Sequence, residues 1–189
     1  MSNTDDIEAR LARLEARHEI SALITRYAIA CDEHDLDELA TLFTNDAEFY
    51  SPNGLMSASG RRAILDMFGK VLSVRGPGYH WTHDHVISFD RRPAGRASGI
   101  VLGHAETTPH GVQSIAAMRY DDEYRIEDGS WRFGRREIRF LYYVPYAEYG
   151  AALNRTDRVV AGERRLAADY PETLRSWQAF DARKRAAQR

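Results

Sequence analysis

The sequence lacks several features that mark particular classes of protein. It has a single cysteine, Cys31, which excludes an internal disulfide and an all-cysteine zinc site. The formal net charge of −2 gives no electrostatic argument for a nucleic-acid partner. No apolar run approaches the roughly 20 residues that cross a bilayer, and the charged start MSNTDDIEARLARLEAR contains no recognisable signal peptide. These absences predict a soluble, cytoplasmic protein with no membrane or nucleic-acid partner.

Motifs for cofactor-dependent or metal-dependent chemistry are missing as well. The chain contains no glycine-rich phosphate loop, no GxSxG elbow and no HExxH pair. We therefore expect no cofactor. At 189 residues, with 43% hydrophobic and 29% charged residues, the chain is best interpreted as one domain with a terminal extension. Ten tyrosines, three tryptophans and seven phenylalanines suit a cavity that binds apolar or aromatic rings, although ordinary cores use the same residues.

The first 78 residues carry helical patterns. Apolar side chains recur every three or four residues from Ile7 to Cys31, which predicts an amphipathic helix that could break near residues 17–18. A short helix is predicted over residues 36–43, a strand over AEFY up to Tyr50, and a third helix around residues 64–72. We interpret Cys31 as a small core residue rather than a nucleophile.

From Tyr79 the apolar period changes to two, which is typical of strands. Four strands are predicted over residues 79–89, 97–108, 112–126 and 131–144, separated by turns at 93–95, 109–111 and 128–129. Helices followed by a run of antiparallel strands indicate an α+β fold with a curved sheet. Further helices are predicted from residue 156 or 157 to 168, and over 171–180, as a helical C-terminal extension.

Two features suggest a site. Asp32 ends the first helical pattern at the edge of its apolar face, where it is either a solvated carboxylate or a side chain at the mouth of a pocket. The segment YHWTHDHVISF places Trp81, His83 and His85 on one predicted strand face. We therefore hypothesise one cavity in which Asp32 and a histidine face each other. Because His83 and His85 share that face, a zinc site is the alternative to consider, but we expect no metal.

The motifs RYAIACDEHDLDELATLF, DAEFY, the histidine strand and YDDEYRIEDGSWRFGRREIRF resemble the SnoaL-like branch of the NTF2-like superfamily. That branch includes scytalone dehydratase, bile-acid 7α-dehydratase and hexachlorocyclohexane dehydrochlorinase. The resemblance implies a cone of helices packed into a curved antiparallel sheet over residues 1–147, followed by the extension at 148–189. It also implies a set of site residues, with His83 preferred over His85 as the base. The implied catalytic residues are Asp32, His83, Tyr27 and Tyr50, and the resemblance also implies a site arginine at Arg136. The candidate substrate-binding residues are His85, Arg136, Trp81 and Tyr142.

These residue types are consistent with a cofactor-independent lyase of the dehydratase type. Histidine can remove a proton beside an activated carbon, and an aspartate bonded to its other nitrogen fixes its tautomer. Tyrosine hydroxyls can stabilise developing negative charge, and Arg136 can hold an anionic oxygen. The expected substrate is a small hydroxylated aromatic, polyketide or steroid-like compound. Isomerisation, cyclisation or release of formaldehyde could use the same cavity, so the residues do not separate these reactions.

A non-catalytic module, such as the small β subunit of a ring-hydroxylating dioxygenase or a ligand-binding protein, is the other hypothesis. It predicts a filled cone with Asp32 and His83 apart or paired elsewhere. The resemblance also implies a homo-oligomer, dimer or trimer, because such cones commonly associate through the outer sheet face. The extension would add apolar surface at Leu166, Tyr170, Leu174 and Trp177.

Overall fold

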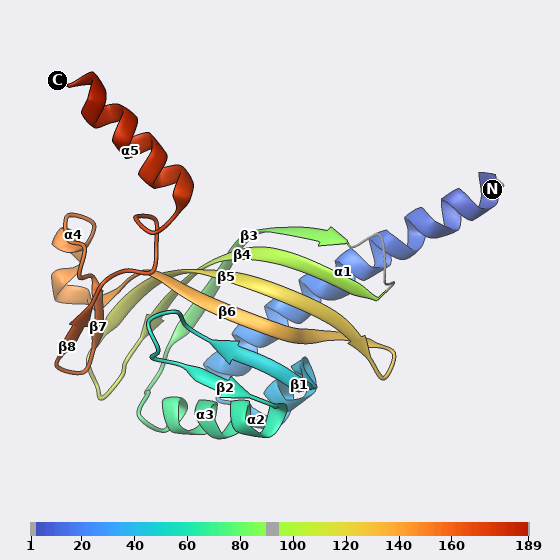
Figure 1. Cartoon of the computed structure of the whole chain (residues 1–189). Coiled ribbons are helices and arrows are strands. Elements are labelled where there is room, and N and C mark those ends of the chain that lie inside the picture. The colour runs from blue at the N-terminus through green and yellow to red at the C-terminus, as the bar shows by residue number, and fades with distance from the viewer. Residues whose placement is uncertain (1–2, 90–94, 189) are drawn as a thin grey trace.

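The computed structural model describes residues 3–89 and 95–188, and its ribbon is shown in Figure 1. Two helices and a strand pair come first, followed by a third helix and four long strands, as the α+β prediction requires. The helices are α1 (Asn3–Glu33), α2 (Leu36–Leu42) and α3 (Arg61–Ser73), and the main strands are β1 (Phe43–Tyr50), β2 (Ser57–Ser59), β3 (Tyr79–Phe89), β4 (Arg96–Thr107), β5 (Ser114–Glu127) and β6 (Ser130–Pro145). Helix α1 is continuous, so the break expected near Arg17 is wrong. No glycine or proline lies there to interrupt it.

The strands form one curved sheet in the order β2-β1-β6-β5-β4-β3, in which β1 and β6 are parallel and the other main neighbours antiparallel. The predicted turn at Asp128-Gly129 is confirmed: both residues have positive φ, 53° and 75°, as a tight hairpin turn between twisted strands requires. The turn predicted at 93–95 falls largely on residues outside the described ranges.

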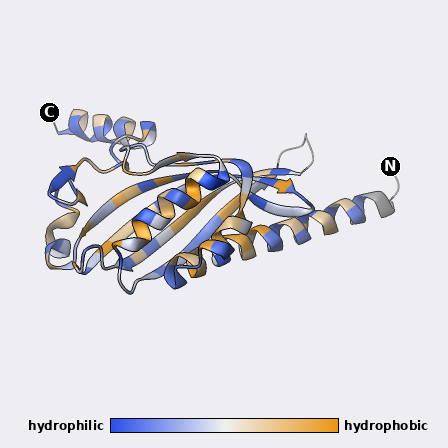
Figure 2. Ribbon diagram, turned by 90° about the horizontal axis from the view of Figure 1, so that it is seen from below, coloured by the Kyte–Doolittle hydropathy of each residue, from blue (hydrophilic) through white to orange (hydrophobic). Residues whose placement is uncertain are grey.

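The helices cover one face of the sheet, which we call the inner face (Figure 2). The core lies between them and includes a cluster of aromatic rings from α1, α3 and the strands: Tyr27, Phe43, Phe49, Phe68 and Phe133. Cys31 is part of this core, and burial raises the pKa of its thiol to about 12. Because a thiol with that pKa stays protonated at neutral pH, its interpretation as a core residue is confirmed.

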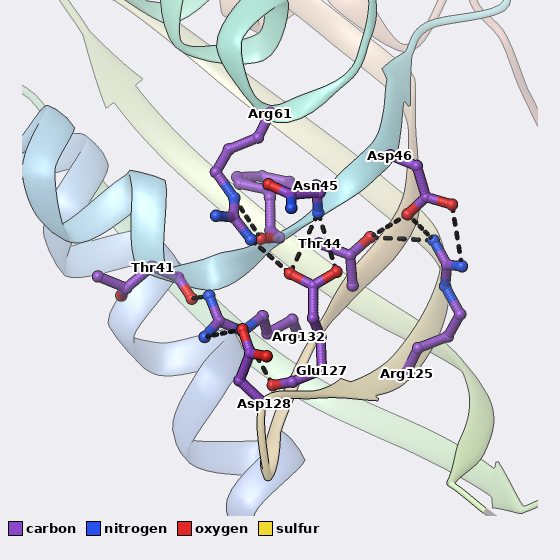
Figure 3. A network of polar contacts seen from close by, with 10 residues as sticks. Thr41, Thr44, Asn45, Asp46, Arg61, Arg125, Glu127, Asp128 and Arg132 are labelled. Atoms are coloured by element: carbon purple, nitrogen blue, oxygen red, sulfur yellow. Dashed lines mark hydrogen bonds and ion pairs between the residues drawn. The ribbon is translucent and has the colours of Figure 1, made fainter.

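A polar network ties the β5–β6 turn to β1 and α3 (Figure 3). The Glu127 carboxylate accepts from the Asn45 backbone N–H at 3.1 Å and pairs with Arg61 at 2.5 Å. Arg125 pairs with Asp46 at 2.6 Å in the same region. This network therefore holds the β5–β6 turn against the beginning of β1 and of α3.

Beyond β6 the chain differs from the predicted helical extension. It forms η1 (Tyr146–Glu148), α4 (Tyr149–Ala152), the hairpin β7 (Val159–Ala161) and β8 (Arg164–Leu166), and then α5 (Arg175–Ala187). The helix predicted to end at residue 168 is thus wrong. Two adjacent valines at 159–160 favour strand, and Gly162, at a φ of 62°, makes the turn. Val159 is fully buried beside Tyr143 of β6. The division at residue 147 stays a prediction.

Arg158 holds this extension in place. Its buried guanidinium donates to the backbone carbonyls of Leu141 at 2.6 Å, Arg155 at 2.7 Å and Tyr170 at 3.0 Å, and it pairs with Glu172 at 2.8 Å. A single side chain therefore joins two segments of the extension, residues 155–158 and 170–172, to β6.

Replacing Arg158 with methionine is expected to loosen the extension, because buried carbonyls that lose their donor cost about 1–3 kcal/mol each. Backbone amides that close this region, such as Asp169 N–H to the Phe140 carbonyl, should then exchange hydrogen faster. The matched control is Arg155→Met, since the Arg155 side chain is half-exposed and bonds only Asp157. Equal exchange rates in wild type and Arg158→Met would contradict this role.

Within the described residues, no helix is long and apolar enough to cross a membrane.

Candidate active site

Asp32 and His80 form a hydrogen-bonded pair where the C-terminal end of α1 meets the beginning of β3. The ring Nδ1 of His80 lies 2.6 Å from one carboxylate oxygen of Asp32, and the backbone N–H of His80 donates to the other at 2.9 Å. Both side chains are mostly buried. The two bonds together fix the position of the imidazole ring relative to the carboxylate.

This geometry also sets the chemistry of the ring. A carboxylate accepts hydrogen bonds, so the neutral imidazole carries its proton on Nδ1 and leaves Nε2 as the basic nitrogen. Among the described residues, Nε2 of His80 has no hydrogen-bond partner. If Nε2 takes up a proton, the charge of Asp32 stabilises the imidazolium. The pair thus has the form of a general base with an orienting carboxylate.

The expected pairing of Asp32 with His83 is wrong, and a β-bulge explains why. The register between β3 and β4 shifts between Thr82 and His85. Before the shift, His80 faces inward opposite the buried Ala105; after it, His85 faces inward opposite the buried Val101. A bulge adds a residue to one strand and reverses which residues face inward. His83 lies in the bulge and is exposed.

His83 and Tyr142 lie away from this pair, with His104. The rings of His83 and His104 are 5.9 Å apart, and Nε2 of His104 lies 2.5 Å from the Tyr142 hydroxyl. Burial and the nearby His83 lower the pKa of His104. Tyr142 packs with Val144 of β6 and Ala152 of α4, on the sheet face opposite the main core. The prediction that Tyr142 binds substrate beside Asp32 is therefore wrong, because Tyr142 lies on the other face of the sheet.

His85 and Trp81 also diverge, although the sequence pattern predicts a shared face. The Nε2 of His85 lies 2.9 Å from the Ser21 hydroxyl of α1, so His85 joins β3 to the helix. Trp81 is exposed and packs against Tyr79 with tilted rings whose centroids are 4.8 Å apart. Because the bulge separates His83 from His85, the two imidazoles do not converge on one face as the zinc alternative requires. Within the described residues, no group of three or more possible metal ligands occurs.

Tyr50 likewise faces away from the core. Its strand neighbour Phe49 is fully buried inward, so Tyr50 faces outward, and its hydroxyl contacts Glu137 and Arg135. Arg135 and Glu137 flank Arg136 on β6, and alternate strand residues face opposite sides. The expected position of Tyr50 in the pocket is therefore wrong.

Arg136 and Tyr27 lie together in the interior. Arg136 is 1% exposed and its guanidinium lies 4.1 Å from the centre of the Tyr27 ring, with Tyr120 and Phe133 at similar distances. It forms an ion pair with the buried Asp122 at 3.1 Å. Its Nη1 is buried without a hydrogen-bond partner. Burial raises the pKa of Tyr27 well above its usual value, so its hydroxyl stays protonated at neutral pH.

Two spaces adjoin His80. The first is an interior cavity of about 10 Å³ lined by Tyr27, His80, Tyr120 and Arg136 among others, which is room for one water molecule. The second is an open groove of about 590 Å³ between α1 and the beginning of β3, lined by Ile29, Asp32, Tyr79, His80 and Trp81 among others. The groove has the size of a small-molecule site, whereas the interior is filled.

The SnoaL-like domain family model matches residues 12–137. A γ-hexachlorocyclohexane dehydrochlorinase from Sphingobium indicum is 30% identical over 144 residues, covering 72% of this chain and 88% of the relative. Two solved structures from Novosphingobium aromaticivorans are similar. A scytalone dehydratase-like protein is 26% identical with a TM-score of 0.63, covering 71% of this chain and 89% of that one. An NTF2-like protein is 25% identical with a TM-score of 0.60, covering 75% and 92%.

The curved sheet with helices on its inner face places the protein among the NTF2-like α+β folds. Within that superfamily, the chain belongs to the SnoaL-like domain family. The resemblance stated from the sequence motifs is therefore confirmed. Family membership does not define a reaction, because one fold can host different sites.

Proposed function

We propose that the protein is a cofactor-independent lyase in which His80 is the general acid–base and Asp32 its orienting partner. The observation that carries the proposal is the pair of hydrogen bonds from His80 to the Asp32 carboxylate, beside a groove large enough for a small molecule. Support comes from the similar proteins, since one is named a dehydrochlorinase and another is scytalone dehydratase-like, and both names denote eliminations.

The elimination balances with these groups. Nε2 of His80 takes the proton from a carbon beside the one that carries the leaving group. The electrons of that C–H bond form the new double bond, and the leaving group departs as chloride, or as water once His80 returns the proton. The Asp32 carboxylate continues to accept the hydrogen bond from Nδ1–H and stabilises the imidazolium. A positioned base of this kind contributes about 10²–10⁴-fold in rate.

The surroundings suggest how a substrate is held. Trp81, Tyr79 and Ile29 give the groove an apolar and aromatic wall next to His80, which suits a small hydrophobic or aromatic compound. Tyr27 can donate a hydrogen bond but cannot act as a base at neutral pH, because burial raises its pKa. Arg136 supplies buried positive charge beneath the site and has an unpartnered Nη1 that could bind an anionic oxygen if the interior opens.

The non-catalytic hypothesis keeps one specific observation in its favour. It predicted a filled cone, and the interior cavity holds only about 10 Å³. On that hypothesis the Asp32–His80 pair joins α1 to β3, and any ligand binds in the groove without turnover. Isomerase, cyclase or formaldehyde-lyase chemistry would use the same pair, so product analysis has to separate those reactions.

The direct test is an activity screen without added cofactor, over hydroxylated aromatic, polyketide and steroid-like compounds and halogenated cyclohexanes. Mass spectrometry reads the loss of water, hydrogen chloride or formaldehyde from each compound, and calorimetry on the same panel reads binding. We expect turnover of at least one compound, and the same rate after chelator treatment. Compounds that bind while none reacts would overturn the lyase proposal and support the ligand-binding module.

A further inference from the structure

The N-terminal part of α1 extends beyond the sheet as an exposed helix (Figures 1 and 2). Every residue from 6 to 15 is exposed, yet Ile7, Leu11 and Leu14 are apolar, with 55%, 54% and 64% of their surface accessible. An isolated helix of this length is marginal in water, and a projecting helix gains stability mainly from packing its apolar face. The exposed apolar row therefore needs a partner.

The apolar row does not continue the face of α1 that packs in the core. At about 100° per residue, Ile7 lies roughly 140–160° round the helix from the buried Ile20, Leu23 and Tyr27. The apolar row therefore faces away from the core of its own chain. Further along nearly the same line the helix meets the edge of its own sheet, because Ser21 bonds His85 of β3 and Arg17 donates to the Ile87 carbonyl. The apolar row is thus confined to the projecting part.

The spacing of the row is that of a coiled coil. Intervals of four and then three residues place Ile7 and Leu14 at heptad position d and Leu11 at position a. The flanking e positions are then Glu8 and Glu15, and the g positions include Arg10 and Arg17, of which Arg17 also donates to the Ile87 carbonyl of its own β3. One flank of the apolar row is acidic and the other is basic.

This charge pattern selects both the partner and its direction. In a parallel pair of identical helices, position g of one helix lies beside position e of the next heptad in the other, so Arg10 would meet Glu15 of the second copy. In an antiparallel pair, g meets g and e meets e, which brings Arg10 near Arg17 and Glu8 near Glu15. We propose that the projecting segment of α1 is a parallel, two-stranded dimerisation helix that pairs with the same segment of a second copy.

The expected dimer is weak on its own. Two heptads bury much less than the roughly 800 Å² per partner of a standard interface, so association through α1 alone should depend strongly on protein concentration. The inference is independent of the proposed lyase activity, because the segment lies outside both the groove and the interior cavity.

Charge reversal tests the direction, with sedimentation equilibrium of the full chain as the measurement. Arg10→Glu and Glu15→Arg should each weaken dimerisation severalfold in a parallel pair, because each brings like charges together. The double variant should recover the wild-type association constant. In an antiparallel pair, each single change would create an attraction instead. Stronger association of either single variant would therefore overturn the proposal.

A cysteine crosslink reports on α1 even if the sheet face also assembles. Ile7→Cys places a thiol in the seam and should give a disulfide-linked dimer on mild oxidation, whereas the exposed Ala9→Cys on the opposite side of the helix should not. Native Cys31 is buried and common to both variants. Equal crosslinking of the two variants would overturn the proposal. It would also be overturned if Trp177→Ala on α5 abolished association while neither charge reversal changed it.

Discussion

Replacing His80 with alanine is expected to lower kcat about 10²–10⁴-fold on any compound that the wild-type protein converts. The change removes the imidazole whose Nδ1 lies 2.6 Å from the Asp32 carboxylate, and with it the proposed general base. Asp32→Asn keeps the shape of the partner but removes the charge that stabilises the imidazolium. It should therefore lower kcat more than it raises KM. Steady-state kinetics on the three proteins measure both effects.

His83→Ala is the matched control, because His83 lies three residues away on the same strand and is exposed. It should retain nearly wild-type kcat, as should Tyr50→Phe, since Tyr50 faces outward toward Glu137. Thermal unfolding should show that all variants remain folded. If His83→Ala lost activity while His80→Ala retained it, the bulge in β3 and the assignment of the base would both be wrong.

Local pattern was sufficient for most of the fold. The helices up to residue 73 follow from apolar residues spaced three or four apart. The four long strands follow from the change to a period of two at Tyr79 and from the Asp128-Gly129 turn. These signals are local, since they depend on which face of one element is buried. The place of Asp32 at the end of α1 was also predictable, because the apolar pattern ends there. That it faces a histidine of β3 was hypothesised from the histidine-rich segment, although the family resemblance selected His83 rather than His80.

The identity of that histidine was not predictable from alternation. A strict period of two groups His83 with His85, and nothing in the apolar pattern shows where an extra residue enters the strand. The polar pair His83-Asp84 lies at the bulge, but the same strand also contains His80, Thr82, His85 and Ser88, so polarity does not mark the position of the extra residue. A second register shift lies between Ala117 and Met118 of β5, where β5 pairs with β6. It turns Tyr142 to the sheet face opposite the one that alternation predicts.

The C-terminal segment shows a different limit. The stretch from 156 to 168 contains helix-compatible residues, and its hairpin depends on the burial of Val159 against β6 and on Arg158. Both are tertiary contacts, which override weak local propensity. Sequence alone could therefore predict that the chain continues beyond the cone, but not how it packs.

Replacing Arg136 with methionine is expected to destabilise the protein by about 3–5 kcal/mol at pH 8, because it leaves the Asp122 carboxylate buried without its cation. Burial already raises the pKa of Asp122 to about 6, even with Arg136 in place, whereas an unfolded aspartate titrates near 3.9. The folded protein therefore binds a proton that the unfolded chain lacks between these pH values. The stability that the protein gains from binding this proton at Asp122 is fully present below about pH 4 and is lost as pH rises through 6.

In the Arg136→Met variant the folded pKa of Asp122 should rise further, because the largest favourable charge has gone. Its destabilisation should therefore be largest at pH 8 and shrink as pH falls toward 5, where Asp122 becomes neutral. Urea unfolding at several pH values measures this dependence. The control is Arg135→Met, whose side chain is part-exposed on the opposite face and should cost less than about 1 kcal/mol.

A double-mutant cycle completes the test. Asp122→Asn removes the titrating charge and keeps the acceptor for the Tyr124 hydroxyl, which donates to Asp122 at 2.9 Å. Combined with Arg136→Met it should recover much of the lost stability and abolish the pH dependence between 5 and 8, because no buried charge remains unpaired. A double variant as unstable as Arg136→Met at pH 8 would show that the aromatic packing of Arg136 against Tyr27 and Tyr120, rather than its charge, holds this part of the core together.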